Sequence, residues 1–229
     1  MPVKIDDITV YNHIKNHLIR QNEQSKMNLD CSYFSVDDSY RDKIKNSIDS
    51  LYTDEYLLDQ IEKTSSKIIY NGRYYYMIDH DDDFESLRNA IVDDLVNDEI
   101  KNGNAPTKSC AVGCLISKEY YTPRIEHSSV IDGDVLRIVS QSNPQWEIGR
   151  NQIKMLKFMQ NIHDMFEPSK WGMYFDLIDN NQFFFDGYFN TSIMAEKIIN
   201  ENQPEDLDLE RFNRIVVDID NLHLPHLGA

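Results

Sequence analysis

The chain has 229 residues, of which 41% are hydrophobic and 11% aromatic, so it can bury a core and does not have the composition of a disordered chain. Its 39 acidic residues outnumber its 23 basic ones, and the formal net charge is −16. Such a field repels phosphate backbones, which disfavours direct binding to DNA or RNA. The charge is explained by solubility, and an acidic surface that engages a basic partner is the alternative. The apolar runs are much shorter than the roughly 20 residues that cross a bilayer, so we predict no membrane span.

Three cysteines, Cys31, Cys110 and Cys114, show no disulfide framework, and no charged and apolar leader precedes them. We therefore expect a protein kept in a reducing cytoplasm. A zinc site made by these cysteines and His163 is disfavoured, since no Cys-x-x-Cys spacing supports it. The few glycines form no phosphate-binding loop, and we predict neither a metal nor a cofactor.

In the first 63 residues, apolar positions at helical spacing predict three helices. The first covers about residues 8–24 and buries Val10, Ile14 and Leu18. A loop and a short extended segment at residues 31–34 follow. The second helix starts at Asp38 or Ser39, and a third, short helix covers about residues 54–63.

The clearest local pattern is a β-hairpin over residues 67–78. Asn71-Gly72 supplies the positive φ angles of a tight turn, and the flanking residues are β-branched or aromatic. Successive strand residues point to opposite faces, so Tyr74 and Tyr76 share one face and Tyr75 takes the other. We expect one of these faces to pack on the helix that follows.

That helix is predicted to begin near Phe84 and to end before Gly103. An acidic run, residues 79–83, precedes it and resembles the start of a calcium loop. The match fails because Phe84 stands where the turn glycine should be and Ala90 where the bidentate glutamate should be. Carboxylates at a helix N-terminus, where the dipole favours them, explain the run.

The remaining elements are predicted mainly as helices. Residues 110–116 form a compact apolar run typical of a short buried helix, and residues 119–134 are predicted as a loop. A long helix is predicted over about residues 145–166, and another begins at Pro168. Residues 183–189 are aromatic and stay unassigned. Two last helices are expected at about residues 192–200 and 207–222.

Two motifs stand out in this second half: Cys-Ala-Val-Gly at residues 110–113 and Gln-x-x-His-Asp at residues 160–164. With residues 10–18 and the Cys-Ser-Tyr run at residues 31–33, they resemble a family of uncharacterised, mostly phage-encoded proteins. The resemblance covers residues 8–34 and 107–175. It implies a phage source and no established activity.

In that family the Cys-x-Tyr element is followed almost at once by Cys-Ala-Val-Gly, whereas here about 70 residues intervene, a length that indicates an insertion. Phe34 also stands where the family has an arginine. We therefore expect a core domain made of residues 1–34 and 107–229, with residues 35–106 as an inserted hairpin-plus-helices segment. The predicted fold class is α+β, mainly helical, in one compact domain with this insertion.

A catalytic hypothesis pairs a cysteine with a histidine. Cys110, at a predicted helix N-terminus, would be the nucleophile of a hydrolase, His163 its base and Asp164 the orienting group. The competing interpretation is that the thiols and the imidazole fill space in the core, because free cysteine is often buried as a small hydrophobe. We favour the second interpretation and lean against an enzyme.

The leading hypothesis is a phage accessory protein that binds a basic host or viral protein, as in host takeover or counter-defence. Tyrosine offers a large contact area at low conformational cost, and carboxylates would surround the hairpin with negative charge. The predicted binding residues are these: Tyr70, Tyr74, Tyr75, Tyr76, Asp79, Asp81, Asp82 and Asp83. A minor virion structural protein is the third alternative, and the sequence leaves the oligomeric state open.

Overall fold

The computed structural model describes residues 5–24, 26–27, 30–57, 59, 67–70, 72–76, 84–105, 107–126, 128–180, 183–185, 187–190, 207–222 and 224. The fold is mainly helical α+β, as predicted. The chain divides into two compact units, Met1–Ser35 with Lys108–Ala229 (unit 1) and Val36–Thr107 (unit 2). Each boundary lies one residue from the division expected from the sequence.

Unit 1 begins with helix α1 (Asp7–Gln21), whose first turn is capped where Asp6 accepts a hydrogen bond from the Thr9 N–H at 2.8 Å. Its buried face includes Val10, Ile14 and Leu18, which confirms the predicted amphipathic pattern. Two short strands, β1 (Lys26–Met27) and β2 (Asp30–Cys31), then pair antiparallel within a segment predicted to be mostly loop. Strands β3 (Phe34–Val36) and β6 (Thr107–Ser109) pair with each other, and the boundary between the units crosses both.

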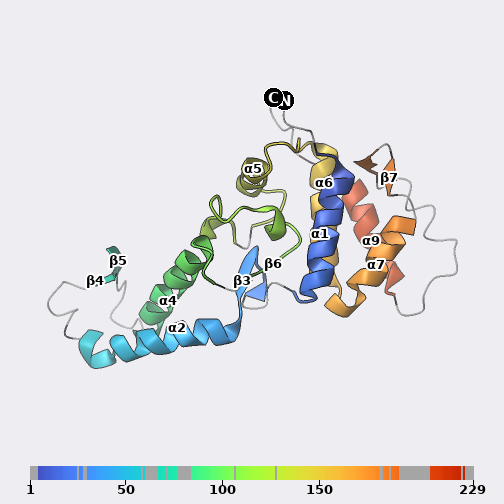
Figure 1. The fold of residues 1–229 in the computed structure, drawn as a ribbon. Helices are drawn as coiled ribbons and strands as arrows, with labels where there is room; N and C mark the ends of the chain where they lie inside the picture. Colours follow the sequence, from blue (N-terminus) through green and yellow to red (C-terminus); the bar gives the residue numbers. More distant parts are fainter. Residues whose placement is uncertain are drawn as a thin grey trace. The chain divides into compact units, whose positions relative to one another are not determined.

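Helix α6 (Arg150–Met165) is the central helix of unit 1. It contacts α1, α7 (Trp171–Asn180) and α9 (Leu209–Asp220) (Figure 1). Its buried residues lie on several sides of the helix, as expected of a central helix. The rings of Phe158, Phe183, Phe189 and Phe212 meet there, with centroids 5.4 to 6.4 Å apart. Aromatic packing of this kind holds the core of unit 1 together.

Two predictions for helices of unit 1 need correction here, and one segment that the sequence left open can be assigned. Residues 133–142, partly assigned to a loop, form helix α5 (Gly133–Ser142), because Asp132 caps it and Val135, Ile138 and Val139 form a buried face. The long helix starts at Arg150 rather than near residue 145, because Gly149 is its extended N-cap. The unassigned aromatic segment contains the antiparallel strands β7 (Phe184–Phe185) and β8 (Tyr188–Phe189), joined through Gly187 at φ +83°.

The other elements of unit 1 are short 3₁₀ turns, η1 (Gly113–Leu115), η2 (Pro123–Ile125) and η3 (Pro168–Lys170). The helix predicted at residues 192–200 lies outside the described residues. None of the helices in the described ranges is long and apolar enough to cross a membrane.

Unit 2 contains α2 (Asp38–Leu51), packed against α4 (Phe84–Lys101), together with the hairpin of β4 (Lys67–Tyr70) and β5 (Arg73–Tyr76). These elements are labelled in Figure 1. The hairpin prediction is confirmed: Tyr70 pairs with Arg73 across the turn, and Gly72 has φ +77°. Residues 54–57 are helical, where the third helix was expected.

Candidate functional site

The Cys-Ala-Val-Gly motif forms a tight buried turn rather than the short α-helix that the sequence predicts. Cys110 follows β6 and is wholly buried, and the three-residue turn η1 begins only at Gly113. The Gly113 N–H donates to Cys110 Sγ at 3.3 Å, and the Cys114 thiol donates to the Ala111 carbonyl at 3.1 Å. Cys110 therefore does not lie at the N-terminus of a helix whose dipole would stabilise a thiolate.

Close packing of the backbone explains the glycine in this motif. A Cβ placed on Gly113 would lie 2.0 Å from the carbonyl oxygen of Tyr33. The Cys110 N–H donates to that same oxygen at 3.4 Å. The turn is thus fastened against the extended segment that precedes β3.

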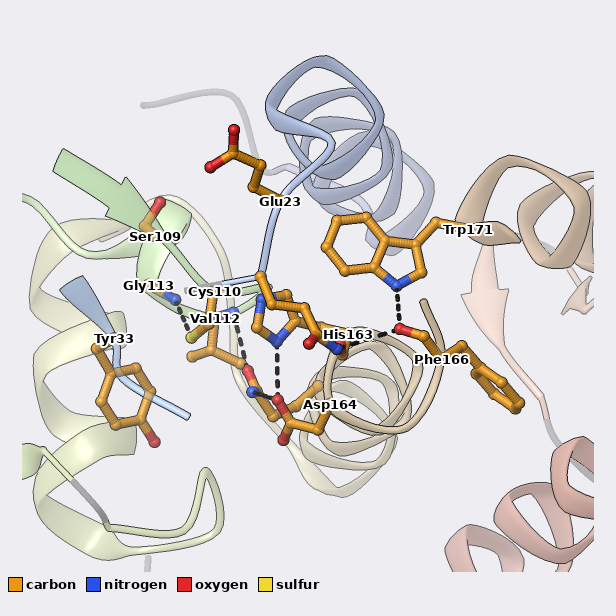
Figure 2. Close-up of polar contacts among 12 residues, drawn as sticks. Glu23, Tyr33, Ser109, Cys110, Val112, Gly113, His163, Asp164, Phe166 and Trp171 are labelled. Carbon is orange, nitrogen blue, oxygen red and sulfur yellow. Dashed lines mark hydrogen bonds and ion pairs between the residues drawn. The ribbon is translucent and has the colours of Figure 1, made fainter. Parts of the chain in front are cut away.

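The Gln-x-x-His-Asp motif lies on α6, and its three polar side chains belong to one hydrogen-bonded chain (Figure 2). His163 Nδ1 lies 2.7 Å from Asp164 Oδ1, and because the carboxylate accepts, Nδ1 donates. The Gln160 amide donates to the same carboxylate oxygen at 2.8 Å. Its carbonyl oxygen accepts the Val112 N–H at 3.4 Å. Gln160 therefore links the Cys110 turn to the histidine and its carboxylate.

Two further contacts hold the histidine in place. The indole of Trp171 stacks on the imidazole of His163, with ring centroids 5.2 Å apart and an interplanar angle of 30°. Both residues are labelled in Figure 2. The Gln24 amide donates to the backbone carbonyls of His163 and Phe166 at 2.7 and 3.1 Å. The segment after α1 is thereby tied to the C-terminal end of α6.

Burial decides what this arrangement can do chemically. The exposed fraction is 0% for both Cys110 and His163, so the structure opens neither side chain to a substrate. Burial also raises the pKa of the Cys114 thiol and keeps it protonated. The hydrogen-bonded chain satisfies buried polar groups, which supports the structural interpretation of the two motifs.

Helix α1 is attached to β6 by a second polar cluster. His17 Nε2 lies 3.1 Å from the Ser109 carbonyl oxygen and 3.0 Å from its hydroxyl. Gln21 accepts the Ser109 N–H at 3.0 Å and donates to its carbonyl oxygen at 3.1 Å. A ring nitrogen that donates to the carbonyl cannot accept the hydroxyl proton, so this pair is not a prepared nucleophile and base.

A cavity of about 610 Å³ lies at the N-terminal ends of α1 and α6. Its lining includes the buried Asp7, whose carboxylate accepts hydrogen bonds from the Trp146 indole at 3.2 Å, the Gln152 amide at 3.0 Å and the Phe189 N–H at 3.3 Å. These three donors are neutral and fasten α1 to α6 and β8. Sequence analysis could not predict this role of Asp7, because its three partners lie 139 to 182 positions away in the sequence.

Metal binding has no support in the described part of the chain, where no group of three or more His, Cys, Asp or Glu side chains could hold an ion. The side chain of Cys31, one of the four residues considered for zinc, lies outside the described residues.

In unit 2, the structure describes the side chains of two of the eight predicted binding residues, Tyr70 and Tyr75. Tyr75 is half-buried, packs against Leu57 and Leu87, and donates its hydroxyl proton to Asp94 at 2.6 Å. This hairpin face packs on α4, as one face was expected to do. The backbones of Tyr74 and Tyr76 lie in β5, but their side chains are outside the described residues, as are Asp79, Asp81, Asp82 and Asp83.

Tyr70 lies on the same face of the hairpin as Tyr75 and takes part in a set of ring contacts that sequence analysis missed. Its ring meets Tyr52 edge to face, and Tyr52 meets Tyr56 in the same way, with centroids 5.6 and 5.5 Å apart. Leu51, the last residue of α2, is 62% exposed, and Tyr56 is 44% exposed. We call Leu51, Tyr52, Tyr56 and Tyr70 the aromatic patch.

Comparison with known proteins identifies no relative: no protein-family model, curated protein or solved structure matches this chain. The phage resemblance therefore stays a prediction from the motifs.

Proposed function

We propose that this chain is a phage accessory protein of the host cytoplasm that binds a basic host or viral protein through the acidic surface of unit 2. The observation that carries the proposal is where the charge lies. Residues 36–107 hold 17 acidic and 8 basic residues, a net charge of −9. Unit 1 has more than twice as many residues but carries only the remaining −7.

Ion pairs within unit 2 join four cations to six carboxylates and leave the net charge of the unit unchanged. Arg41 pairs with Asp93, and Lys45 with Glu85 at 2.9 Å. Arg73 pairs with Asp94 and Asp98 at 3.2 and 2.8 Å, and Arg88 with Asp49 and Asp54 at 3.3 and 2.6 Å. The unit therefore keeps its excess of carboxylates, which can attract a basic surface.

A charge-matched pair of variants tests the proposal. Asp38→Asn, Asp42→Asn and Glu55→Gln remove three exposed charges from unit 2, and Glu119→Gln, Asp176→Asn and Asp218→Asn remove three from unit 1. Proteins captured from host lysate by the full-length chain would be identified and their affinities measured. At about 0.2–1 kcal/mol for each exposed charge pair, the unit 2 variant should bind the captured partner about tenfold more weakly, with the unit 1 variant close to wild type.

Equal loss from both variants would mean that only net charge matters, and no loss from either would remove the acidic surface from the proposal. Deletion of residues 35–106 provides a second test. If the chain captures the same partners with and without this segment, the proposal is contradicted. Detection of the chain in purified particles would instead favour the virion alternative.

The hydrolase alternative has one observation in its favour, the 2.7 Å contact of His163 with Asp164. A thiol reagent at neutral pH separates it from a structural role. We expect labelling of Cys110 to be slow and limited by unfolding, because the thiol is buried. Fast labelling that is lost in His163→Ala would support the hydrolase.

A further inference from the structure

The aromatic patch exposes apolar surface at one end of unit 2. Leu51 ends α2 with most of its side chain in solvent, and Tyr56 lies in the helical residues 54–57 that follow. Scattered exposed apolar residues are ordinary on protein surfaces, but tyrosine is enriched among the residues that dominate binding energy at interfaces. Three tyrosines meet here, and the exposed Leu51 directly precedes one of them.

Contacts beneath the patch hold it in one conformation. The Tyr52 ring meets Tyr56 at an interplanar angle of 85° and Tyr70 at 78°, so it is wedged between them. Tyr52 also packs against the buried Leu57 and Leu87, and Arg88 donates to its carbonyl oxygen at 3.2 Å. A surface ordered before binding loses little conformational entropy when a partner arrives.

Three acidic residues, Asp49, Asp54 and Glu55, belong to the segment that carries Tyr52 and Tyr56. Asp49 and Asp54 share the single guanidinium of Arg88, which is largely buried, with an exposed side-chain fraction of 16%. The exposed side chain of Glu55 precedes Tyr56 in the same helical turn. The patch therefore combines aromatic faces with an excess of negative charge, and it favours a cation that can also make apolar contacts.

We infer that the aromatic patch binds an arginine of the basic partner, with its guanidinium over Tyr56 beside Glu55 and a neighbouring apolar side chain of the partner on Leu51. Arginine fits better than lysine because its planar, weakly hydrated guanidinium stacks on a ring while its N–H groups donate to a carboxylate. This inference rests on the proposed function and names the chemistry by which the partner is recognised.

Two synthetic peptides of equal length and charge serve as probes, one built from arginine and leucine and the other from lysine and serine. Binding to the full-length chain is measured by titration calorimetry. Wild type should prefer the arginine–leucine peptide by about fivefold or more, and the double variant Leu51→Ser, Tyr56→Ala should lose this preference. The control Ile19→Ser, Tyr188→Ala likewise replaces one exposed aliphatic residue and one exposed tyrosine, here in unit 1, and should keep the preference.

The outcomes separate this inference from the proposed function. If the unit 2 charge variant binds both peptides more weakly while the double variant keeps the wild-type preference, the role of the acidic surface is supported and the patch inference is overturned. If the charge variant weakens neither peptide, the proposed function itself fails. Self-association in analytical ultracentrifugation that is lost in the double variant would also overturn the inference, because the occupant would be a second copy of the chain.

Discussion

Backbone packing decides which residue type the Cys110 turn can accept, and Gly113 shows this most directly. A methyl group there would lie 2.0 Å from the Tyr33 carbonyl oxygen, an atom of the backbone that cannot rotate away. We predict that Gly113→Ala lowers the free energy of unfolding by about 2 kcal/mol or more, measured by urea denaturation. Gly172→Ala is the matched control, since nothing lies within 4 Å of its added methyl, and it should be neutral or stabilise by up to about 1 kcal/mol.

His17 should give the protein an acid-sensitive attachment of α1 to β6. Burial lowers its pKa from 6.5, against the opposing effect of the Ser109 carbonyl, so the folded protein holds this ring neutral. The unfolded chain then binds the proton first, and stability falls as the pH drops below about 6.5 towards the lowered folded pKa.

We expect His17→Gln to reduce the slope of the unfolding free energy against pH by at most about 1.4 kcal/mol per pH unit. The reason is that glutamine cannot take up the one proton that His17 binds in the unfolded chain. Glutamine still offers an N–H donor to Ser109. Urea unfolding of both proteins at several pH values between 7.5 and 5.5 measures the slope. Parallel slopes would show that His17 does not contribute.

The residues of the candidate site illustrate what sequence can and cannot predict. Adjacent His163 and Asp164 were recognised as a pair, and the structure brings them together. The bridging role of Gln160 was not predicted, although it belongs to the same motif, because its partner Val112 lies 48 positions earlier and only the folded turn brings the two together. Likewise, spacing alone could not show that Tyr52 joins Tyr70 from another element.

At the scale of elements, prediction succeeded where one local signal decided the structure. Amphipathic spacing placed α1 and α2, and Asn-Gly placed the β4–β5 hairpin. It failed at residues 110–116, where apolar composition suggested an α-helix but contact with the Tyr33 carbonyl oxygen fixes a tight turn. A run of buried residues does not distinguish these two structures without its neighbours.

The N-terminal end of α1 depends on its cap. The Asp6 carboxylate accepts the Thr9 N–H. Hydrogen bonding by Thr9, first through its side chain and then through this N–H, lowers the pKa of the Asp6 carboxyl. Asp6→Ala should cost about 0.5–2 kcal/mol of unfolding free energy, and Asp6→Ser should recover most of it because serine also caps helices well. An alanine variant as stable as wild type in urea denaturation would contradict the assignment of this cap.

At the scale of the whole molecule, the chain divides into two units that each bury their own apolar residues. Unit 2 is built on α2, α4 and Leu57, whereas unit 1 is built around α6. Units with separate cores can open with different free energies, so we predict two transitions in differential scanning calorimetry. Leu87→Ala and Phe158→Ala, each costing about 2–5 kcal/mol, should each lower a different one of the two transitions. A single transition lowered by both substitutions would show instead that the two units unfold as one.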